Sequence, residues 1–337
     1  MSAKVMVRMI LSKHVVGLYI TYFLFVVLCF VSGNRSGGYD YDNYLKMISY
    51  IQNGESVWDK IILAKDPLFG FIVYLINPTS NEFNSVFMAV AIIACLTKYF
   101  YLSKIKRPIL FFLLYLPLFS PSLDFAAIRA MMGIMFLLAA LACKDNRSIN
   151  GFLFFGVLAF LSHVSMFIPL MFSMSFFSKK FSSHKIIVCL IVLILSFFLK
   201  PVISLFSNTV SYIESGGTYL AFFPIILVIL SLLCIGIYID SKAESDFNAT
   251  CYRISFLVIL LSLGTASDVV IVSARLMQLS QVLLLINICN SLAAVTRTNC
   301  YFYMLSLIFF LIPLIYRNIT MSLWSESLKY IGLIFNA

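Results

Sequence analysis

The sequence contains little charge. Charged residues make up 11% of its 337 residues, whereas about a quarter is usual in a soluble domain. Hydrophobic residues make up 62% of the chain, and the mean hydropathy is +1.01. The core of a soluble protein could not bury so many apolar side chains, so a water-soluble globular protein is excluded. The apolar runs also lack the two-residue alternation of an outer-membrane barrel. We therefore expect an all-α polytopic integral membrane protein, a bundle of about 11 transmembrane helices.

Other features are missing as well. The eight cysteines stand singly and form no C-x-x-C pair, which gives no sign of a disulfide framework or a zinc site. The net charge is +10, but the basic residues do not gather in one patch, so no nucleic-acid partner is expected. Without a recognisable repeat or soluble second domain, residues 1–337 are expected to form a single membrane domain. No small-residue cleavage site follows Phe30, so Val15 to Val31 is expected to be a retained first span.

The basic residues lie in short connectors between apolar runs, which is the pattern of cytoplasmic loops. They are Lys4, Arg8 and Lys13; Lys98, Lys104, Lys106 and Arg107; Lys144 and Arg147; and Lys179, Lys180 and Lys185. With the N-terminus inside, residues 32–66 form the first extracytoplasmic loop. The apolar segment from Pro67 to Ile76 is too short to span alone and is expected to be interfacial or re-entrant.

Residues 109–177 are expected to form central paired spans. In the first pair, Ile109 to Phe119 leads outward, a turn at Ser120-Pro121-Ser122 lies near the outer surface, and Asp124 to Cys143 returns. The second pair is Gly151 to Leu161 and His163 to Phe177, or one long span kinked near Pro169. Two spans fit better, because basic connectors then lie inside at both ends. The other expected spans are Phe83 to Tyr101, Ile186 to Phe206, Tyr219 to Ile239, Ile254 to Thr265, Arg275 to Val295 and Tyr301 to Ile315.

Three ionisable residues interrupt apolar runs: Arg129, His163 and Arg275. An ionisable side chain within the bilayer costs about 2.5–3.5 kcal/mol on insertion scales, so it usually has a function and faces a cavity or the bundle interior. Two arginines and a histidine suit a phosphate ligand, because guanidinium groups are bidentate donors and histidine accepts a proton near neutral pH. Two plainer interpretations stay open, which are snorkelling for the arginines and an interhelical hydrogen bond for His163.

On this topology, these three residues and four acidic side chains lie at one depth, at or just below the outer surface. The acidic residues are Asp40, Asp42, Asp124 and Asp268. Asp124 and Arg129 are five positions apart, about 140° around a helix, so the partner of Arg129 is expected off its own helix. Arg275, Gln278 and Gln281 form a polar strip. Their convergence predicts an outward-facing pocket for a phosphate or pyrophosphate.

Five short segments of the chain occur in a distinctive order: Gly38-Tyr-Asp40-Tyr-Asp-Asn-Tyr44, Lys65-Asp66-Pro67-Leu68-Phe69-Gly70, Ile128-Arg129-Ala130, Leu161-Ser162-His163-Val164-Ser165 and Arg275-Leu276. They resemble the G-x-D-x-x-x-Y, acidic-Pro/Gly-aromatic, I-R-Q/A, F-H-x-S and late R-hydrophobic elements of the EpsG-type, Wzy-like polymerases of O-antigen and exopolysaccharide repeat units. The resemblance covers most of the chain and is strongest from Gly38 to Ser165. Ala130 replaces a usual glutamine, which leaves any role of that amide open.

The resemblance implies a glycosyltransferase that polymerises oligosaccharide repeat units on undecaprenyl pyrophosphate, at the periplasmic or outer face of the bacterial cytoplasmic membrane. It also implies membrane lipid and a chain-length regulator of the polysaccharide co-polymerase kind as partners. We assign Arg129 and Arg275 to the pyrophosphate and His163 to the acceptor hydroxyl as general base. Asp40 is the alternative base or positions the acceptor. Further substrate contacts are expected from Tyr39, Tyr44, Asp124, Asp268 and Gln278, with a tyrosine stacking on sugar rings.

Other functions stay open. A lipid-linked oligosaccharide flippase or other transporter would favour charges near the midplane and detectable repeats. An O-antigen ligase, or an enzyme with a lipid-phosphate sugar donor, often carries a large late periplasmic loop, whereas residues 207–217 form a short one. An Asp40-led glycosyltransferase would use Asp40-Tyr-Asp42 as a D-x-D. That single short motif is a weak signal for metal, so neither a metal nor a cofactor is expected.

Overall fold

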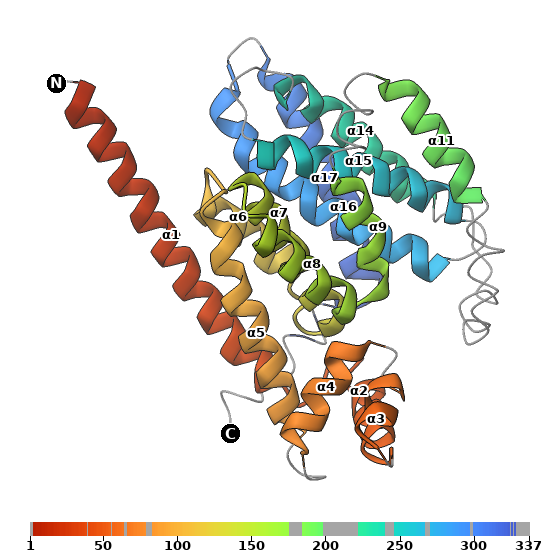
Figure 1. Ribbon diagram of the computed structural model, residues 1–337. Helices are drawn as coiled ribbons and strands as arrows, with labels where there is room; N and C mark the ends of the chain where they lie inside the picture. Colours follow the sequence, from red (N-terminus) through yellow and green to blue (C-terminus); the bar gives the residue numbers. More distant parts are fainter. Residues whose placement is uncertain are drawn as a thin grey trace. The chain divides into compact units, whose positions relative to one another are not determined.

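The computed structural model describes residues 3–38, 40–54, 56–63, 66–78, 83–174, 184–197, 222–239, 246–266, 270–296, 299–323, 325 and 327 (Figure 1). The regular elements in these ranges are all helices, which confirms the all-α prediction. The chain folds into two compact units. Unit 1 is Met1–Phe167 with Arg317–Ala337, and unit 2 is Ile168–Tyr316. The expected single membrane domain, 1–337, stays a prediction.

Six helices of the described part are long and apolar enough to cross a membrane: His14–Gly33, Asn84–Leu102, Phe222–Ile239, Asp246–Thr265, Val272–Ser291 and Cys300–Thr320. The shorter apolar helices are Pro67–Ile76, Pro108–Leu118, Ile149–Ser162, Val164–Ser173 and Ile186–Ser196. A helix of 11 residues, such as the second of these, is only ~16 Å long, about half the hydrocarbon thickness. The lengths fit a multi-pass membrane protein, but the expected count of about 11 spans is not confirmed.

The core of unit 2 is the pair α15 (Asp246–Thr265) and α16 (Val270–Ser291). α14 (Phe222–Ile239) packs on both, and α11 (Lys185–Phe197) packs on α15. The expected start of α15 at Ile254 was wrong, because Asp246 already begins the helix. In the first turn of this helix Asn248 is fully buried, and it accepts a hydrogen bond from Asn290 of α16 at 3.4 Å.

Paired serines hold the helices of unit 2 together. In each pair both hydroxyls donate to the partner's backbone carbonyl, at 2.7–3.0 Å. Within the described ranges the pairs are Ser255 with Ser280, Ser262 with Ser273, and Ser231 with Ser306. The first two join α15 to α16 with opposite chain directions, and the third joins α14 to α17 (Cys300–Thr320). Small hydroxyl residues that allow close approach are typical of helix contacts in membranes.

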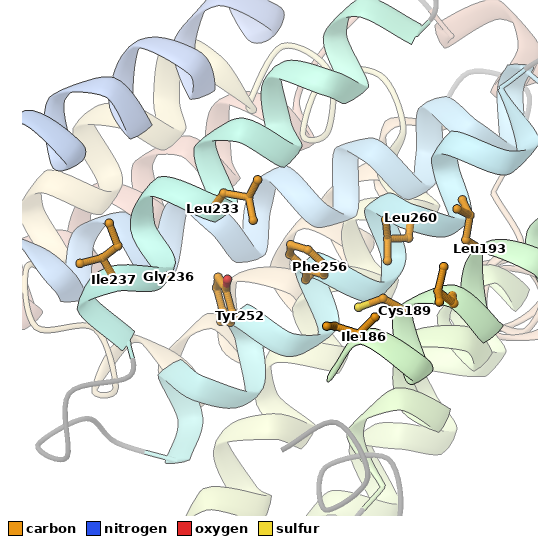
Figure 2. A pocket seen from close by; sticks show the side chains of 10 residues that line it. Ile186, Cys189, Leu193, Leu233, Gly236, Ile237, Tyr252, Phe256 and Leu260 are labelled. Atoms are coloured by element: carbon orange, nitrogen blue, oxygen red, sulfur yellow. The ribbon is translucent and has the colours of Figure 1, made fainter. Parts of the chain in front are cut away.

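A cavity of about 570 Å³ lies between α11, α14 and α15 of unit 2 (Figure 2). Aliphatic and aromatic side chains line it, and the hydroxyl of Tyr252 lies so near Gly236 that a Cβ there would be 2.6 Å from Oη. None of its lining residues is charged. Such a lining suits hydrocarbon rather than a diphosphate, so the phosphate site has to be sought elsewhere.

Unit 1 is organised around α7 (Ile128–Asp145). From its first residue to Ala142, every side chain of α7 is buried except Arg129, which is partly exposed. α5 (Asn84–Leu102) and α8 (Ile149–Ser162) pack against it. A helix that is apolar on all sides needs such cover, and large apolar side chains on the outer faces of α5 and α8 are exposed, as lipid-facing residues would be.

The cytoplasmic connectors predicted after α5 and α7 lie together at one end of unit 1. Lys104 Nζ is 2.5 Å from both Asp145 Oδ2 and Asn146 Oδ1. α7 therefore ends here, and Arg129, near its start, lies at the other end of the helix. α1 (Ala3–Gly33) packs beside α5, as Figure 1 shows.

The segment expected to be the first outer loop is largely helical. It contains α2 (Tyr41–Gln52) and α3 (Val57–Leu63), and α4 (Pro67–Ile76) follows. The apolar helix of the sequence prediction and α4 have the same bounds. Pro67 at its first position and Asn77 in the left-handed conformation after it, with φ 43°, explain where it begins and ends.

The turn between α6 (Pro108–Leu118) and α7 is longer than the sequence predicted. The second helix was expected to start at Asp124, but α7 begins at Ile128, and residues 118–128 are all buried by surrounding protein. The expected place of the turn near the outer surface stays a prediction. The turn satisfies its own backbone, because the amides of Leu123, Phe125 and Ala127 donate to the carbonyls of Phe119, Ser120 and Ser122 at 2.8–3.1 Å. Irregular backbone is tolerated in a membrane protein where surrounding protein buries it.

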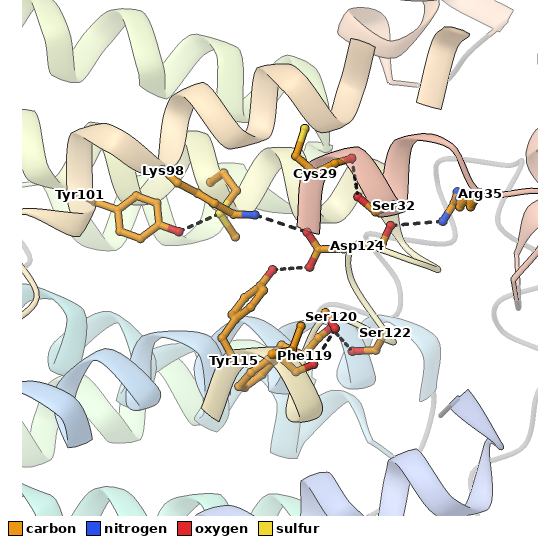
Figure 3. A network of polar contacts seen from close by, with 12 residues as sticks. Cys29, Ser32, Arg35, Lys98, Tyr101, Tyr115, Phe119, Ser120, Ser122 and Asp124 are labelled. Carbon is orange, nitrogen blue, oxygen red and sulfur yellow. Dashed lines mark hydrogen bonds and ion pairs between the residues drawn. The ribbon is translucent and has the colours of Figure 1, made fainter. Parts of the chain in front are cut away.

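A buried ion pair fixes this turn to α5 (Figure 3). Lys98 Nζ lies 3.3 Å from Asp124 Oδ1, and both side chains are 3% exposed. Tyr115 Oη donates to the other carboxylate oxygen at 2.7 Å, and the ammonium lies 4.5 Å from the Phe25 ring centroid. The expectation that Lys98 lies in a basic connector was wrong. The lysine lies within α5, because the carboxylate and the ring offset part of the cost of burying it.

We expect Lys98→Met to destabilise the protein by ~3–5 kcal/mol, because it leaves the Asp124 carboxylate buried without its cation. Thermal unfolding of the purified protein in detergent measures the loss. The double variant Lys98→Met/Asp124→Asn, which buries no charge and keeps the Tyr115 partner, should unfold at a higher temperature than Lys98→Met alone. A single variant as stable as the wild type would contradict this account of the pair.

Candidate functional site

Arg129, the second residue of α7, forms an ion pair with Asp66. The arginine side chain is 26% exposed and that of Asp66 is 8% exposed. The backbone of Asp66 is extended, as is usual for a residue before proline. Its side chain makes no capping hydrogen bond to α4, so the carboxylate is oriented by its ion pair with Arg129. The prediction that Arg129 finds its partner off its own helix is confirmed.

Aromatic rings surround the Arg129 guanidinium. Its Cζ lies 5.6 Å from the Tyr44 ring centroid and 6.0 Å from that of Phe69. Tyr44 itself is buried, with 6% exposure, and also lies 5.8 Å from the Cζ of a second arginine, Arg35. In this structure Tyr44 therefore contacts cations, and its stacking on a sugar stays a prediction. Tyr39, the other candidate for stacking, lies outside the described residues.

Arg35 was not a candidate in the sequence analysis. It follows the first span, where an arginine is usually interpreted as snorkelling, yet its side chain is fully buried. Its Nη1 donates to the backbone carbonyl of Asp124 at 3.3 Å (Figure 3), and its Cζ lies 4.5 Å from the Phe87 ring centroid. Burial lowers the pKa of Arg35 to about 10, an effect opposed by neighbouring tyrosines and by the charges of Asp40 and Asp124. The group is therefore still a cation at neutral pH.

Asp40 precedes α2 and is partly exposed. Its side chain does not cap the helix, which leaves the carboxylate in the electrostatic range of Arg35. Asp42, in the first turn of α2, is exposed. Among the described residues, no three His, Cys, Asp or Glu side chains gather in a group that could hold a metal ion. The expectation of a metal-independent site stays a prediction.

Gly38 brings this loop against the buried turn. Its φ of +125° lies in a region that L side chains rarely adopt, and a Cβ at this position would be 2.6 Å from the carbonyl oxygen of Phe125. Only glycine satisfies both conditions. The glycine of the G-x-D segment thus has a structural reason, because it allows Arg35 and Asp40 to lie beside the residues that precede α7.

His163 ends α8 in an extended conformation, with φ −162° and ψ 119°, and a 3-10 turn, η1 (Val164–Met166), follows. The helix thus breaks at His163 rather than at Pro169, as two separate segments require. A Cβ on Gly133 would be 3.3 Å from His163 Cβ. Gly133 lies one turn after Arg129 on the same face of α7, so His163 and Arg129 are neighbours.

The hydrogen bonds of His163 fix its tautomer. The backbone N–H of Ser165 points at Nδ1 at 3.3 Å, and the Ser165 hydroxyl lies 3.0 Å from the same nitrogen. A backbone N–H can only donate, so Nδ1 is the acceptor and the neutral ring carries its proton on Nε2. The neutral ring therefore has its N–H donor on the side away from Ser165. The choice between Asp40 and His163 as the base stays a prediction.

Among the described residues, the structure does not bring the side chains of the remaining predicted ones to Arg129. Asp124 is buried with Lys98, so it positions the turn rather than offering an exposed substrate contact. Arg275 and Gln278 belong to unit 2, where Arg275 Nη1 donates to Gln278 Oε1 at 3.3 Å, as the polar strip predicted. Their contact with substrate stays a prediction. Asp268 lies outside the described residues.

Comparison with known proteins identifies the family of the chain. The model of a family described as EpsG matches residues 18–331, nearly the whole chain. This chain belongs to the EpsG family. The family is of the Wzy-like polymerase type, so the chain has a membrane polysaccharide polymerase-like role. No curated protein and no solved structure matches.

We expect Gly38→Ala to abolish most polysaccharide polymerisation while the protein still reaches the membrane. The alanine Cβ would destabilise the backbone at this φ by roughly 1–3 kcal/mol, and it would push the loop that contains residue 38 away from the Phe125 carbonyl. Polymer made by cells that depend on the variant measures the effect. Gly17→Ala is the matched control, because its nearest neighbour would be 3.6 Å away, an ordinary contact. Normal polymer from Gly38→Ala would show that the loop tolerates displacement.

Proposed function

We propose that this protein polymerises oligosaccharide repeat units carried on undecaprenyl pyrophosphate, at the outer face of the bacterial cytoplasmic membrane. The observation that carries the proposal is the placement of Arg129. In an EpsG-family membrane protein, this partly exposed cation is held by Asp66 and lies one helical turn from His163. It is at the end of unit 1 opposite the basic connectors joined by Lys104, which is the outer end if those connectors are cytoplasmic.

The reaction joins two lipid-linked saccharides. A hydroxyl oxygen of the incoming repeat unit forms a bond to the anomeric carbon of the growing chain. The bond from that carbon to the phosphate oxygen breaks, and undecaprenyl pyrophosphate leaves with the electron pair. The hydroxyl proton goes to a base. Because diphosphate is already a good leaving group, the protein has to supply positive charge, orientation and the base. A single displacement inverts the anomeric centre.

The residues divide these tasks. Arg129 neutralises the departing diphosphate, and Asp66 and the aromatic rings orient its guanidinium. The carboxylate of Asp40 is partly exposed and makes no capping hydrogen bond to α2. It accepts the proton of the attacking hydroxyl. His163 donates from Nε2 to an oxygen of the substrate. Arg275, which donates to Gln278, is assigned to pyrophosphate binding.

We expect Arg129→Ala to lower polymerisation by about 100- to 1,000-fold, since one preorganised donor is worth ~3–4 kcal/mol. Arg129→Lys should recover only part, because the bidentate fork is lost. The measurement is the saccharide displayed by cells. A polymerase defect leaves single repeat units attached outside, whereas a flippase defect leaves none outside and a ligase defect leaves polymer unattached. Either of the last two results would overturn the proposal.

The two candidate bases are separated by conservative variants. We expect Asp40→Asn to reduce turnover by at least about 100-fold, since the amide cannot take a proton. His163→Gln, which retains an N–H donor, should keep much more activity than His163→Ala. Turnover is measured on purified lipid-linked repeat units in detergent, with Asp42→Asn as the control, because Asp42 is exposed on the same helix. Equal activity of Asp40→Asn and wild type would remove Asp40 from the reaction.

A further inference from the structure

Arg35 is a buried cation whose hydrogen-bonding capacity is mostly unused. The side chain is 0% exposed, and neither its Nε nor its Nη2 has a hydrogen-bond partner in the described structure. Among the described residues, Arg35 donates to a neutral acceptor, the Asp124 carbonyl. A buried guanidinium with unpaired donors is costly, and native proteins usually satisfy such groups.

The nearby carboxylates do not supply the missing partner. The Asp124 carboxylate binds Lys98 and Tyr115 through its two oxygens. Asp66 binds Arg129. Asp40 acts on Arg35 through its charge without a hydrogen bond to Nε or Nη2. The positive charge of Arg35, next to Phe87 and Tyr44, is therefore not neutralised by a hydrogen-bonded carboxylate, and one more anion would balance it.

We propose that Arg35 binds an oxyanion of the substrate, at a site shared with Arg129 around the Tyr44 ring. The inference rests on the proposed function. The Cζ atoms of Arg35 and Arg129 both lie over the Tyr44 ring, at 5.8 and 5.6 Å from its centroid. Planar donors of this kind suit phosphate and carboxylate alike. The oxyanion comes from the lipid diphosphate or from an acidic sugar.

α2 covers this site. Tyr41 and Tyr44, both on α2, lie against Phe87, with centroid distances of 5.3 and 6.1 Å, and Tyr41 Oη donates to Asn84 Oδ1 at 3.3 Å. An anion reaches Nε and Nη2 of Arg35 only when α2 moves from these contacts. Binding of the anion then returns α2 to a position in which the guanidinium is paired.

The test is ligand-dependent stability of the purified full-length protein in detergent. Inorganic pyrophosphate and glucuronate are titrated separately at matched ionic strength, and the unfolding temperature is measured. A ligand that binds the folded state raises this temperature according to its concentration and dissociation constant. For wild type we expect a rise with at least one probe. For Arg35→Gln the dissociation constant should increase about 10- to 100-fold.

Arg253→Gln is the matched control, because Arg253 is a half-buried arginine of unit 2 with its own partner, Thr250, at 2.8 Å. It should keep the full rise. Should Arg35→Gln not fold, Arg35→Lys serves in its place, since it keeps the charge but loses the two unused donors. A rise with pyrophosphate assigns the lipid diphosphate, and a rise with glucuronate alone assigns a sugar carboxylate.

Two outcomes overturn the proposal. One is the absence of any rise with either probe in the wild type. The other is an Arg35 variant that is less stable without ligand yet shows the full rise, which would make Arg35 a purely structural support for the turn. Polymerisation is measured separately on the same variants. A protein that binds the anion through Arg35 but makes no polymer would refute the proposed function and leave this inference standing.

Discussion

The ion pair between Lys98 and Asp124 is the constraint on which unit 1 depends. It fastens an irregular turn inside a bundle of apolar helices, where an unpaired charge would be too costly to keep. The turn in turn sets where α7 begins and supplies the carbonyl that Arg35 binds. Residues with no direct part in chemistry thus decide where the reactive cations lie.

Two of the ion pairs in the described part of unit 1 differ in their exposure, and the difference separates a structural pair from a functional one. Lys98 and Asp124 are almost completely buried, whereas Arg129 keeps about a quarter of its side chain exposed beside Asp66. A closed pair can hold a fold together but cannot exchange partners. An arginine that is oriented on one side and accessible on another can receive a phosphate without rearranging its own support.

The sequence predicted the elements well and the pairings poorly. Long apolar runs gave the helical class, α4 and the first span. Arg129, on α7, and His163, at the end of α8, proved to be neighbours. Lys98 was misplaced because a lysine near a helix end has the same local pattern whether it faces headgroups or a distant carboxylate. Arg35 was missed for the same reason, since its burial depends on rings far along the chain. A one-dimensional pattern carries hydropathy, but not the identity of long-range partners.

The short α6 has a consequence for the order of assembly. Eleven residues ending in a buried, polar-containing turn cannot remain across a bilayer as an independent segment. This helix has to enter together with its neighbours. It packs on α1, and the turn that follows it carries a carboxylate. Because α1 and α5 are synthesised earlier, the ammonium group that neutralises this carboxylate is already in the membrane when the turn arrives. Chain order thus places the counter-ion ahead of the charge that needs it.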